Sequence, residues 1–400
     1  MNVQNARWLL VTIFVLVVAA GCSPAASLPS SRSAPTATPP PPMSLRTPAS
    51  QPSIDYVTLE AEIEKAITAG PATLDKVRAV LVNVDGETKI AHYRHGFTED
   101  DHGHVFSVTK SVLSILIGIA IEDDLIADID QPLVELLPKH RDAMSSDTAK
   151  VTLRHLMTMS GGFNPEFPNG GLVWEKAAEP GSSLVDLLLR QRKDFEPGKA
   201  FWYSDTSAHL VAAVLAAALE RADGNHPRTV LDYARQKLFN PLGISTHPSF
   251  SQALPDLFAP EFVTAGFGWG TDPNDIHLGG YGLRLTAPDM MKIGELYRSH
   301  GVWNGEQIVP SAWIQQCTSA STFETKIGDI GDNEYGLLWW IIGQPEGAGY
   351  FAAGFGGQRI VVLPKSRAVI VYLSDVQPDS QIDGRDLESL DNVFMSAFPQ

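Results

Sequence analysis

Two side chains at the start of an apolar segment could do chemistry together. Ser107 and Lys110 are three positions apart, so a helix beginning at Ser107 would place their Cβ atoms about 5–6 Å apart on one face. Residues 108–121 are mostly apolar on all sides of that helix, which predicts a buried core helix. Burial favours the neutral form of an amine, so the pair has the parts of an activated nucleophile. The alternative is a helix-capping serine followed by a lysine whose ammonium reaches solvent.

Two later stretches could complete such a site. Tyr203 and Asp205 follow a Pro-Gly turn and precede an apolar helical segment, 210–219. A phenol placed there could relay a proton or could simply pack. Gly354 begins a glycine-rich stretch at a strand, where small residues would let a substrate lie against the backbone or would form a bulge or tight turn.

The elements that must position these residues come from both ends of the chain. A turn at Asp85-Gly86 between β-branched segments predicts one hairpin, and the residues around Lys365 predict another. We expect an α+β fold, with one antiparallel sheet from the two chain ends and the active site at its seam with a mainly helical insertion. The predicted segments are helices at 59–67 and 387–394, strands at 77–84, 89–93, 359–364 and 368–373, and the insertion at about 126–298.

Taken in order, these motifs resemble those of a known superfamily. Ser107-x-x-Lys110, Tyr203-x-Asp205 and the glycine-rich strand at Gly354 are similar to the three motifs of serine β-lactamases and penicillin-binding proteins. The string 354–358 looks most like the branch that includes 6-aminohexanoate-dimer hydrolase and related esterases. Further stretches similar to the class C and esterase branch are 122–132, 151–161, 238–243 and 279–289.

The resemblance implies a β-lactamase/transpeptidase-like fold and a serine hydrolase without a cofactor. Ser107 would attack an amide or ester carbonyl, Lys110 with its pKa lowered by burial would be the general base, and Tyr203 would relay the proton. The backbone N–H groups of Ser107 and Phe355 would hold the oxyanion. The residues expected to line the oxyanion and substrate site are Gly354, Phe355, Gly356 and Asp205.

The sequence departs from the family pattern at two places. Asp205 stands where asparagine is usual, and Ala352-Ala353 stand where a lysine or histidine and then a threonine or serine are usual. In β-lactamases and transpeptidases that cation helps to hold the substrate carboxylate. Because that cation is missing here, β-lactams and D-Ala-D-Ala peptides are the alternative substrates rather than the first choice. A catalytically silent sensor or scaffold is the alternative function.

Other constellations are less favoured. A histidine-rich segment, 92–104, would bind a metal only if its side chains converged, and we expect no metal there. A Ser-His-Asp triad is possible in principle, but no Gly-x-Ser-x-Gly elbow is present. Residues 266–270 are expected to form a loop near the cleft, and Trp339-Trp340 are expected to pack, with pocket lining as the alternative.

The first residues predict export. Arg7, an apolar run and small residues ending in Gly21-Cys22 resemble a bacterial lipoprotein signal over residues 1–22, in which Cys22 is lipidated. An ordinary cleaved signal or a membrane anchor is the alternative. Residues 23–53, rich in Pro, Ser, Ala and Thr, predict a disordered tether, followed by the folded domain at 54–400. We expect the domain on the outer side of the cytoplasmic membrane, touching it only through the lipid.

Composition limits the partners. The formal charge is −16, which argues against nucleic acid and anionic membrane surfaces. Of the two cysteines, Cys317 is expected to be a buried, inert thiol. The remaining partner is a small-molecule amide or ester, and the oligomeric state stays open.

Overall fold

The computed structural model describes residues 54–163, 176–177, 179–250, 266–328, 331–343, 347–376, 382 and 384–398. The predicted signal segment with Cys22 and the predicted tether, 23–53, lie outside the described residues. Within these ranges, no helix has both the length and the apolar character needed to cross a membrane.

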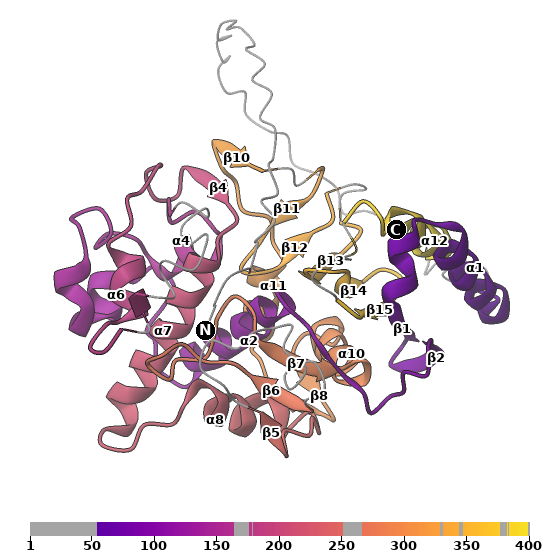
Figure 1. Ribbon diagram of the computed structural model, residues 1–400, viewed down its shortest axis with the longest axis horizontal. Helices are drawn as coiled ribbons and strands as arrows, with labels where there is room; N and C mark the ends of the chain where they lie inside the picture. The colour runs from indigo at the N-terminus through magenta and orange to yellow at the C-terminus, as the bar shows by residue number, and fades with distance from the viewer. Residues whose placement is uncertain are drawn as a thin grey trace, which may run out of the picture. The chain divides into compact units, whose positions relative to one another are not determined.

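A seven-stranded sheet forms one half of the structure (Figure 1). Its order is β11-β12-β13-β14-β15-β1-β2, and every neighbouring pair is antiparallel. The β1–β2 hairpin turns at Asp85 and Gly86, both with positive φ, as the sequence predicted. Strands from both ends of the chain therefore meet in one sheet, which confirms the predicted fold class. The strands are β1 (Val77–Val84), β2 (Glu87–Tyr93), β11 (Glu334–Tyr335), β12 (Trp340–Ile341), β13 (Tyr350–Gly354), β14 (Gln358–Leu363) and β15 (Ala368–Ser374).

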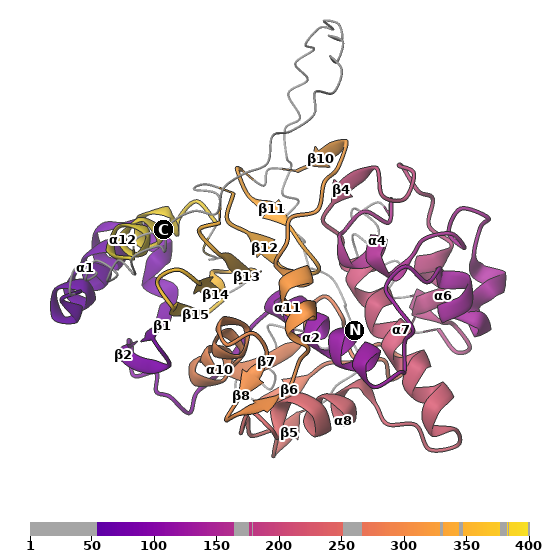
Figure 2. The ribbon, with the colours of Figure 1, turned by 180° about the vertical axis from the view of Figure 1, so that it is seen from behind.

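Helices cover both faces of this sheet because both faces are apolar. On β15, Val369 and Val371 join the main core, whereas Tyr372 faces the opposite side and donates its hydroxyl to Asp391 on α12. The helices α1 and α12 lie together on that side, and α2 and α10 lie on the core side (Figures 1 and 2). These helices are α1 (Tyr56–Ala69), α2 (Val108–Glu122), α10 (Ala287–Arg298) and α12 (Glu388–Ala397).

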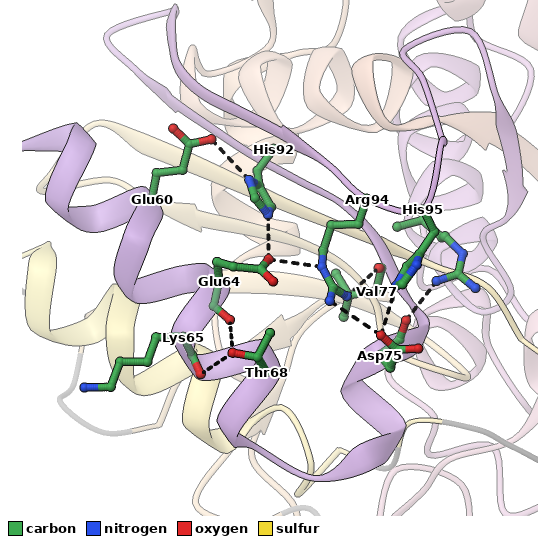
Figure 3. A network of polar contacts seen from close by, with 10 residues as sticks. Glu60, Glu64, Lys65, Thr68, Asp75, Val77, His92, Arg94 and His95 are labelled. Atoms are coloured by element: carbon green, nitrogen blue, oxygen red, sulfur yellow. Dashed lines mark hydrogen bonds and ion pairs between the residues drawn. The ribbon is translucent and has the colours of Figure 1, made fainter.

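The helix α1 is held at the edge of the sheet by charged side chains (Figure 3). His92 on β2 lies between two glutamates of α1, with its ring nitrogens 3.1 Å from Glu60 Oε1 and 2.9 Å from Glu64 Oε2. Arg94 Nε also donates to Glu64 Oε2, at 3.1 Å. His95 Nε2 lies 2.9 Å from Asp75 Oδ1. The network is partly exposed and joins α1, which precedes the sheet in the chain, to β2.

The second half is mainly helical and carries short strands (Figure 1). Residues 266–270, expected to be a loop, instead include the strand β6, which pairs with β7, so that expectation was wrong. A four-stranded sheet has the order β3-β7-β6-β5, and β4 pairs with β10. The remaining elements are η1 (Ala72–Lys76), β3 (His102–His104), α3 (Leu133–Leu136), η2 (Pro138–Ala143), α4 (Leu153–Met157), α6 (Leu184–Leu189), β4 (Ala200–Trp202), α7 (Asp205–Asp223), α8 (Val230–Ala234), η3 (Arg235–Phe239), β5 (Ser249–Phe250), β6 (Phe267–Trp269), β7 (Leu283–Thr286), β8 (Val302–Trp303), β9 (Glu306–Gln307), α11 (Ser311–Cys317) and β10 (Thr325–Ile327).

The helix α2 lies in the centre of the molecule. Every residue from Val108 to Ala120 is buried, as its all-round apolar sequence predicted. Its buried hydroxyls are satisfied: Ser111 donates to the Leu338 carbonyl at 2.8 Å, and Ser114 donates to the Leu337 carbonyl at 2.7 Å. Cys317, beside Ser114, is buried as predicted, and burial raises the pKa of its thiol to about 12.

Candidate active site

Ser107 occupies the position immediately before α2. It has helical dihedral angles, but its side chain makes no capping hydrogen bond to the helix. Its Oγ instead accepts a hydrogen bond of 2.8 Å from Lys110 Nζ. Lys110 is only 1% exposed, so its ammonium does not reach solvent. The alternative of a capping serine with a solvent-reaching lysine does not fit this geometry.

The chain enters this position through a strained turn. Phe106 has φ +46°, a left-handed conformation that non-glycine residues seldom adopt. It is buried, and its N–H donates to His104 Nδ1 at 2.9 Å. The turn ends β3 at His104 and redirects the chain into α2 within three residues. Strain of this kind persists only where the surroundings enforce it, and it is concentrated at functional sites.

Lys110 holds three acceptors at once. Besides Ser107 Oγ, its Nζ donates to Asp205 Oδ1 at 2.6 Å and to the Gly280 carbonyl at 2.7 Å. An ammonium has three N–H donors, so this set uses all of them. The arrangement brings together the start of α2, the start of α7 and the chain just before β7.

The ion pair reverses the expected effect of burial on Lys110. Burial alone lowers the pKa of this ammonium, but the charge and hydrogen bond of Asp205, together with the phenol of Tyr203, raise it above the usual lysine value. The expectation of a lowered pKa was therefore wrong in sign, because it left out the carboxylate. Lys110 is an ammonium in the resting protein at neutral pH.

Tyr203 lies beside this pair, between β4 and α7. Lys110 Nζ is 4.8 Å from the centroid of its ring. The Tyr203 ring also stacks on Trp340, with centroids 5.5 Å apart and planes 20° apart. Trp340 in turn stacks on Phe351 of β13. Trp339 is fully buried and Trp340 is half-buried, so both pack as expected, while Trp340 also backs a residue of the candidate site.

The end of β13 approaches the nucleophile closely. A Cβ at Gly354 would lie 2.3 Å from the Val105 carbonyl oxygen and 3.2 Å from Ser107 N, so only glycine fits without a shift. The next residue, Phe355, is 49% exposed and packs on Phe106, with ring centroids 5.4 Å apart. Among the described residues, neither the Ser107 nor the Phe355 amide donates a backbone hydrogen bond. Both amides are thus open, and Phe355 follows directly on the glycine that approaches the Ser107 backbone.

The neighbours of Gly354 along the chain lie in β13 or in the turn that follows it. Ala352 is fully buried, and Ala353 is half-buried on the same strand. Gly356 has φ +74° in the turn between β13 and β14, and a Cβ there would contact Val376. The structure therefore places Gly356 in a tight turn, which was the alternative for this stretch.

Sequence reasoning gave no role to the chain before β7. The Gly280 carbonyl accepts from Lys110, and a Cβ at Gly280 would lie 2.6 Å from Asp205 Oδ1. Behind it, His209 on α7 is buried and bonds to the fully buried Asp272, at 3.2 Å. The adjacent glycines Gly279 and Gly280 were the available signal, because two successive glycines before a strand mark a close backbone approach.

The histidine-rich segment forms no metal site in the part of the chain that the structure describes. There, no group of three His, Cys, Asp or Glu side chains is placed to hold an ion. His92 and His95 bond to carboxylates near α1, and burial lowers the pKa of His104 well below its usual value.

Comparison with known proteins agrees with this architecture. A family model described as Beta-lactamase matches residues 72–392. The 6-aminohexanoate-dimer hydrolase of Paenarthrobacter ureafaciens is 22% identical over 320 residues, which cover 76% of this chain and 74% of that protein.

Solved structures resemble the chain at the level of the fold. EstCE1, described as a hydrolase with promiscuous acyltransferase activity, is 18% identical with a TM-score of 0.62, covering 85% of this chain and 99% of that one. A penicillin-binding protein homologue from Caulobacter crescentus is 16% identical with a TM-score of 0.60, covering 85% and 97%. The matched segment includes the serine, the lysine and the glycine-rich strand described above, and the chain belongs to the beta-lactamase family.

Proposed function

We propose that the protein is a serine hydrolase that cleaves an amide or ester bond through an acyl-enzyme on Ser107. The observation that carries this proposal is the 2.8 Å hydrogen bond between Lys110 Nζ and Ser107 Oγ, at a buried lysine that also bonds Asp205. Burying an ammonium is unfavourable unless it is paired, and this pair directs it at a hydroxyl with no capping role.

Attack by Ser107 forms a bond between its Oγ and the substrate carbonyl carbon and gives a tetrahedral intermediate, which becomes the acyl-enzyme ester when the leaving group departs. The carbonyl electron pair moves onto oxygen, where the open amides of Ser107 and Phe355 would stabilise it by about 3–4 kcal/mol per donor. Collapse of this intermediate breaks the bond to the leaving group. The proton lost by Ser107 passes through Lys110 and Tyr203 to the leaving nitrogen or oxygen. Water then releases the acyl group and returns a proton to Ser107.

The raised pKa of Lys110 sets the pH dependence of this step. Lys110 accepts the Ser107 proton only in its neutral form, which Asp205 disfavours at neutral pH. The activity is therefore expected to rise with pH in the alkaline range.

Hydrolysis of model substrates tests the proposal. A panel of phenyl esters, short linear amides, a cephalosporin and a D-Ala-D-Ala peptide is assayed with the wild-type protein and with Ser107→Ala. We expect turnover of an ester or amide that is lost in the variant. Turnover that persists in Ser107→Ala, or a panel that gives no turnover at all, contradicts the proposal. The second outcome favours a sensor or scaffold.

We also propose that the domain works outside the cytoplasmic membrane, attached through a lipid on Cys22. The sequence of residues 1–22 supports this, and residues 23–53 would supply the spacer. Incorporation of a labelled fatty acid that is lost in Cys22→Ala, but kept in Cys317→Ala, is the expected result. Equal labelling of both variants would contradict the anchor.

A further inference from the structure

Asp205 presents a negative charge at the mouth of the candidate site. Its side chain is 51% exposed, whereas the side chain of its partner Lys110 is 2% exposed. The ion pair is therefore oriented, with its positive end buried and its negative end toward solvent. Asp205 Oδ1 and Ser107 Oγ both accept hydrogen bonds from Lys110 Nζ, so the two oxygens lie within about 5–6 Å of each other.

One oxygen of Asp205 remains available to a ligand. Oδ1 bonds Lys110 and lies against the backbone of Gly280. Oδ2 makes no hydrogen bond within the described residues. An ionised carboxylate only accepts hydrogen bonds, so this oxygen attracts donors and cations and repels anions.

The opposite wall of the site offers no free cation among the described residues. Ala352, Ala353 and Gly354 carry no charge. Arg359, which pairs with Ala353 across the strands, donates to Asp391 at 2.9 Å and stacks over Phe351. Its charge is thus already matched by a carboxylate. A substrate anion would meet an exposed carboxylate on one side and an uncharged strand on the other.

We infer that the site selects acyl groups that carry a positive charge a few ångströms from the scissile carbonyl, and disfavours those that carry a carboxylate there. This inference rests on the proposed hydrolase function and names its substrate class. A positive charge on the acyl group a few ångströms from the half-exposed Asp205 carboxylate should raise kcat/KM by about tenfold, and a negative charge there should lower it by about tenfold.

Three phenyl esters with the same chain between the carbonyl and the terminal group test it directly. The esters of 4-(trimethylammonio)butanoate and 5,5-dimethylhexanoate are isosteric and differ in charge, and the monoester of glutarate carries a smaller, anionic carboxylate at that end. All rates are measured at low ionic strength, and the rate of the Ser107→Ala variant with the same ester is subtracted from each. We expect kcat/KM to fall in the order cationic, neutral, anionic, and the ratio of cationic to anionic to shrink as salt is added.

Two variants separate Asp205 from the overall charge of −16. Asp205→Asn should reduce the cationic-to-anionic ratio by about tenfold or more, whatever it does to the absolute rates. Glu87→Gln removes one exposed negative charge at the far edge of the sheet and should leave the ratio unchanged. A ratio near one in the wild type, or a ratio that survives Asp205→Asn, overturns the inference. If no ester shows Ser107-dependent hydrolysis, the proposed function fails, and the inference falls with it.

Discussion

The two walls of the candidate site are built from opposite kinds of contact. On the side of α2 and α7, Ser107, Lys110 and Asp205 form a chain of short polar bonds that extends to the Gly280 carbonyl. On the side of β13, the residues from 352 to 355 contribute small and aromatic side chains without charge. In the proposed reaction, the first wall would set the protonation state and direction of the nucleophile. The second would shape the space beside it and supply a backbone amide.

This difference gives the two walls different tasks. The polar wall holds the hydroxyl and the buried lysine of the proposed reaction, and its exposed carboxylate, Asp205, is the group by which we infer that the site favours cationic acyl groups. Residues 352–355 of the uncharged wall cannot hold an anion by charge, whereas the Asp205 side chain on the other wall is a half-exposed carboxylate. Substitutions in the two walls should therefore have different effects.

Ser107→Ala, in the polar wall, is expected to have the largest effect. Removing the nucleophile should lower kcat by at least about 10³-fold, with little effect on stability because the side chain does not cap α2. Ester hydrolysis and thermal unfolding measure the two quantities. Ser111→Ala is the matched control, since it should cost about 1–3 kcal/mol by leaving the Leu338 carbonyl unpaired while hydrolysis persists. Equal activity in wild type and Ser107→Ala contradicts the assignment.

Gly354→Val tests the uncharged wall. The new Cβ would lie 2.3 Å from the Val105 carbonyl oxygen, so β13 must move away from Ser107 and the Phe355 amide with it. We expect kcat to fall by about 100-fold, as for a lost oxyanion donor. Gly384→Val is the control, because a Cβ at Gly384 has no neighbour within 4 Å. Unchanged kcat in a folded Gly354→Val protein would show that this wall takes no part in the reaction.

Asp205→Asn tests how the polar wall sets protonation. Burial lowers the pKa of Lys110, and Asp205 is the main influence that raises it. Without the carboxylate charge the pKa falls, so neutral amine is present at lower pH. The rising limb of the plot of kcat/KM against pH should therefore move to lower pH. A limb that stays in place, or moves to higher pH, would mean that Lys110 is not the titrating base.

His92→Gln is expected to have the smallest effect. Its hydrogen bonds to Glu60 and Glu64 are partly exposed, and polar contacts at the surface contribute about 0–1 kcal/mol. The variant should unfold within about 1 kcal/mol of wild type and keep its kcat/KM. A change of activity above about threefold would indicate that α1 is coupled to the site.

The sequence predicted the hairpins and the buried helix well because the signals for them are local. Alternating and β-branched segments marked the hairpins at Asp85-Gly86 and around Lys365, and the all-round apolar run after Ser107 marked a buried helix. Tyr203 also lies beside Lys110, and Gly354 lies beside Ser107, as the resemblance implied. Local pattern and family resemblance were enough for these features.

The rest could not be predicted because it depends on contacts between distant residues. The direction of the Lys110 pKa shift is set by Asp205, 95 positions away, and burial alone gives the opposite sign. The Gly280 carbonyl is a backbone acceptor, so no side-chain type in the sequence indicates its role. The strand β6 is three residues long and contains a glycine, so its sequence gave too little periodicity to distinguish it from a loop.

The most direct test of the central claim is to trap the acyl-enzyme equivalent. The protein is treated with a fluorophosphonate, and intact mass measurement followed by peptide mapping locates the adduct. We expect one phosphonyl group, attached to Ser107 and absent from Ser107→Ala. An adduct on a different residue, or no adduct on a protein that hydrolyses esters, would contradict it.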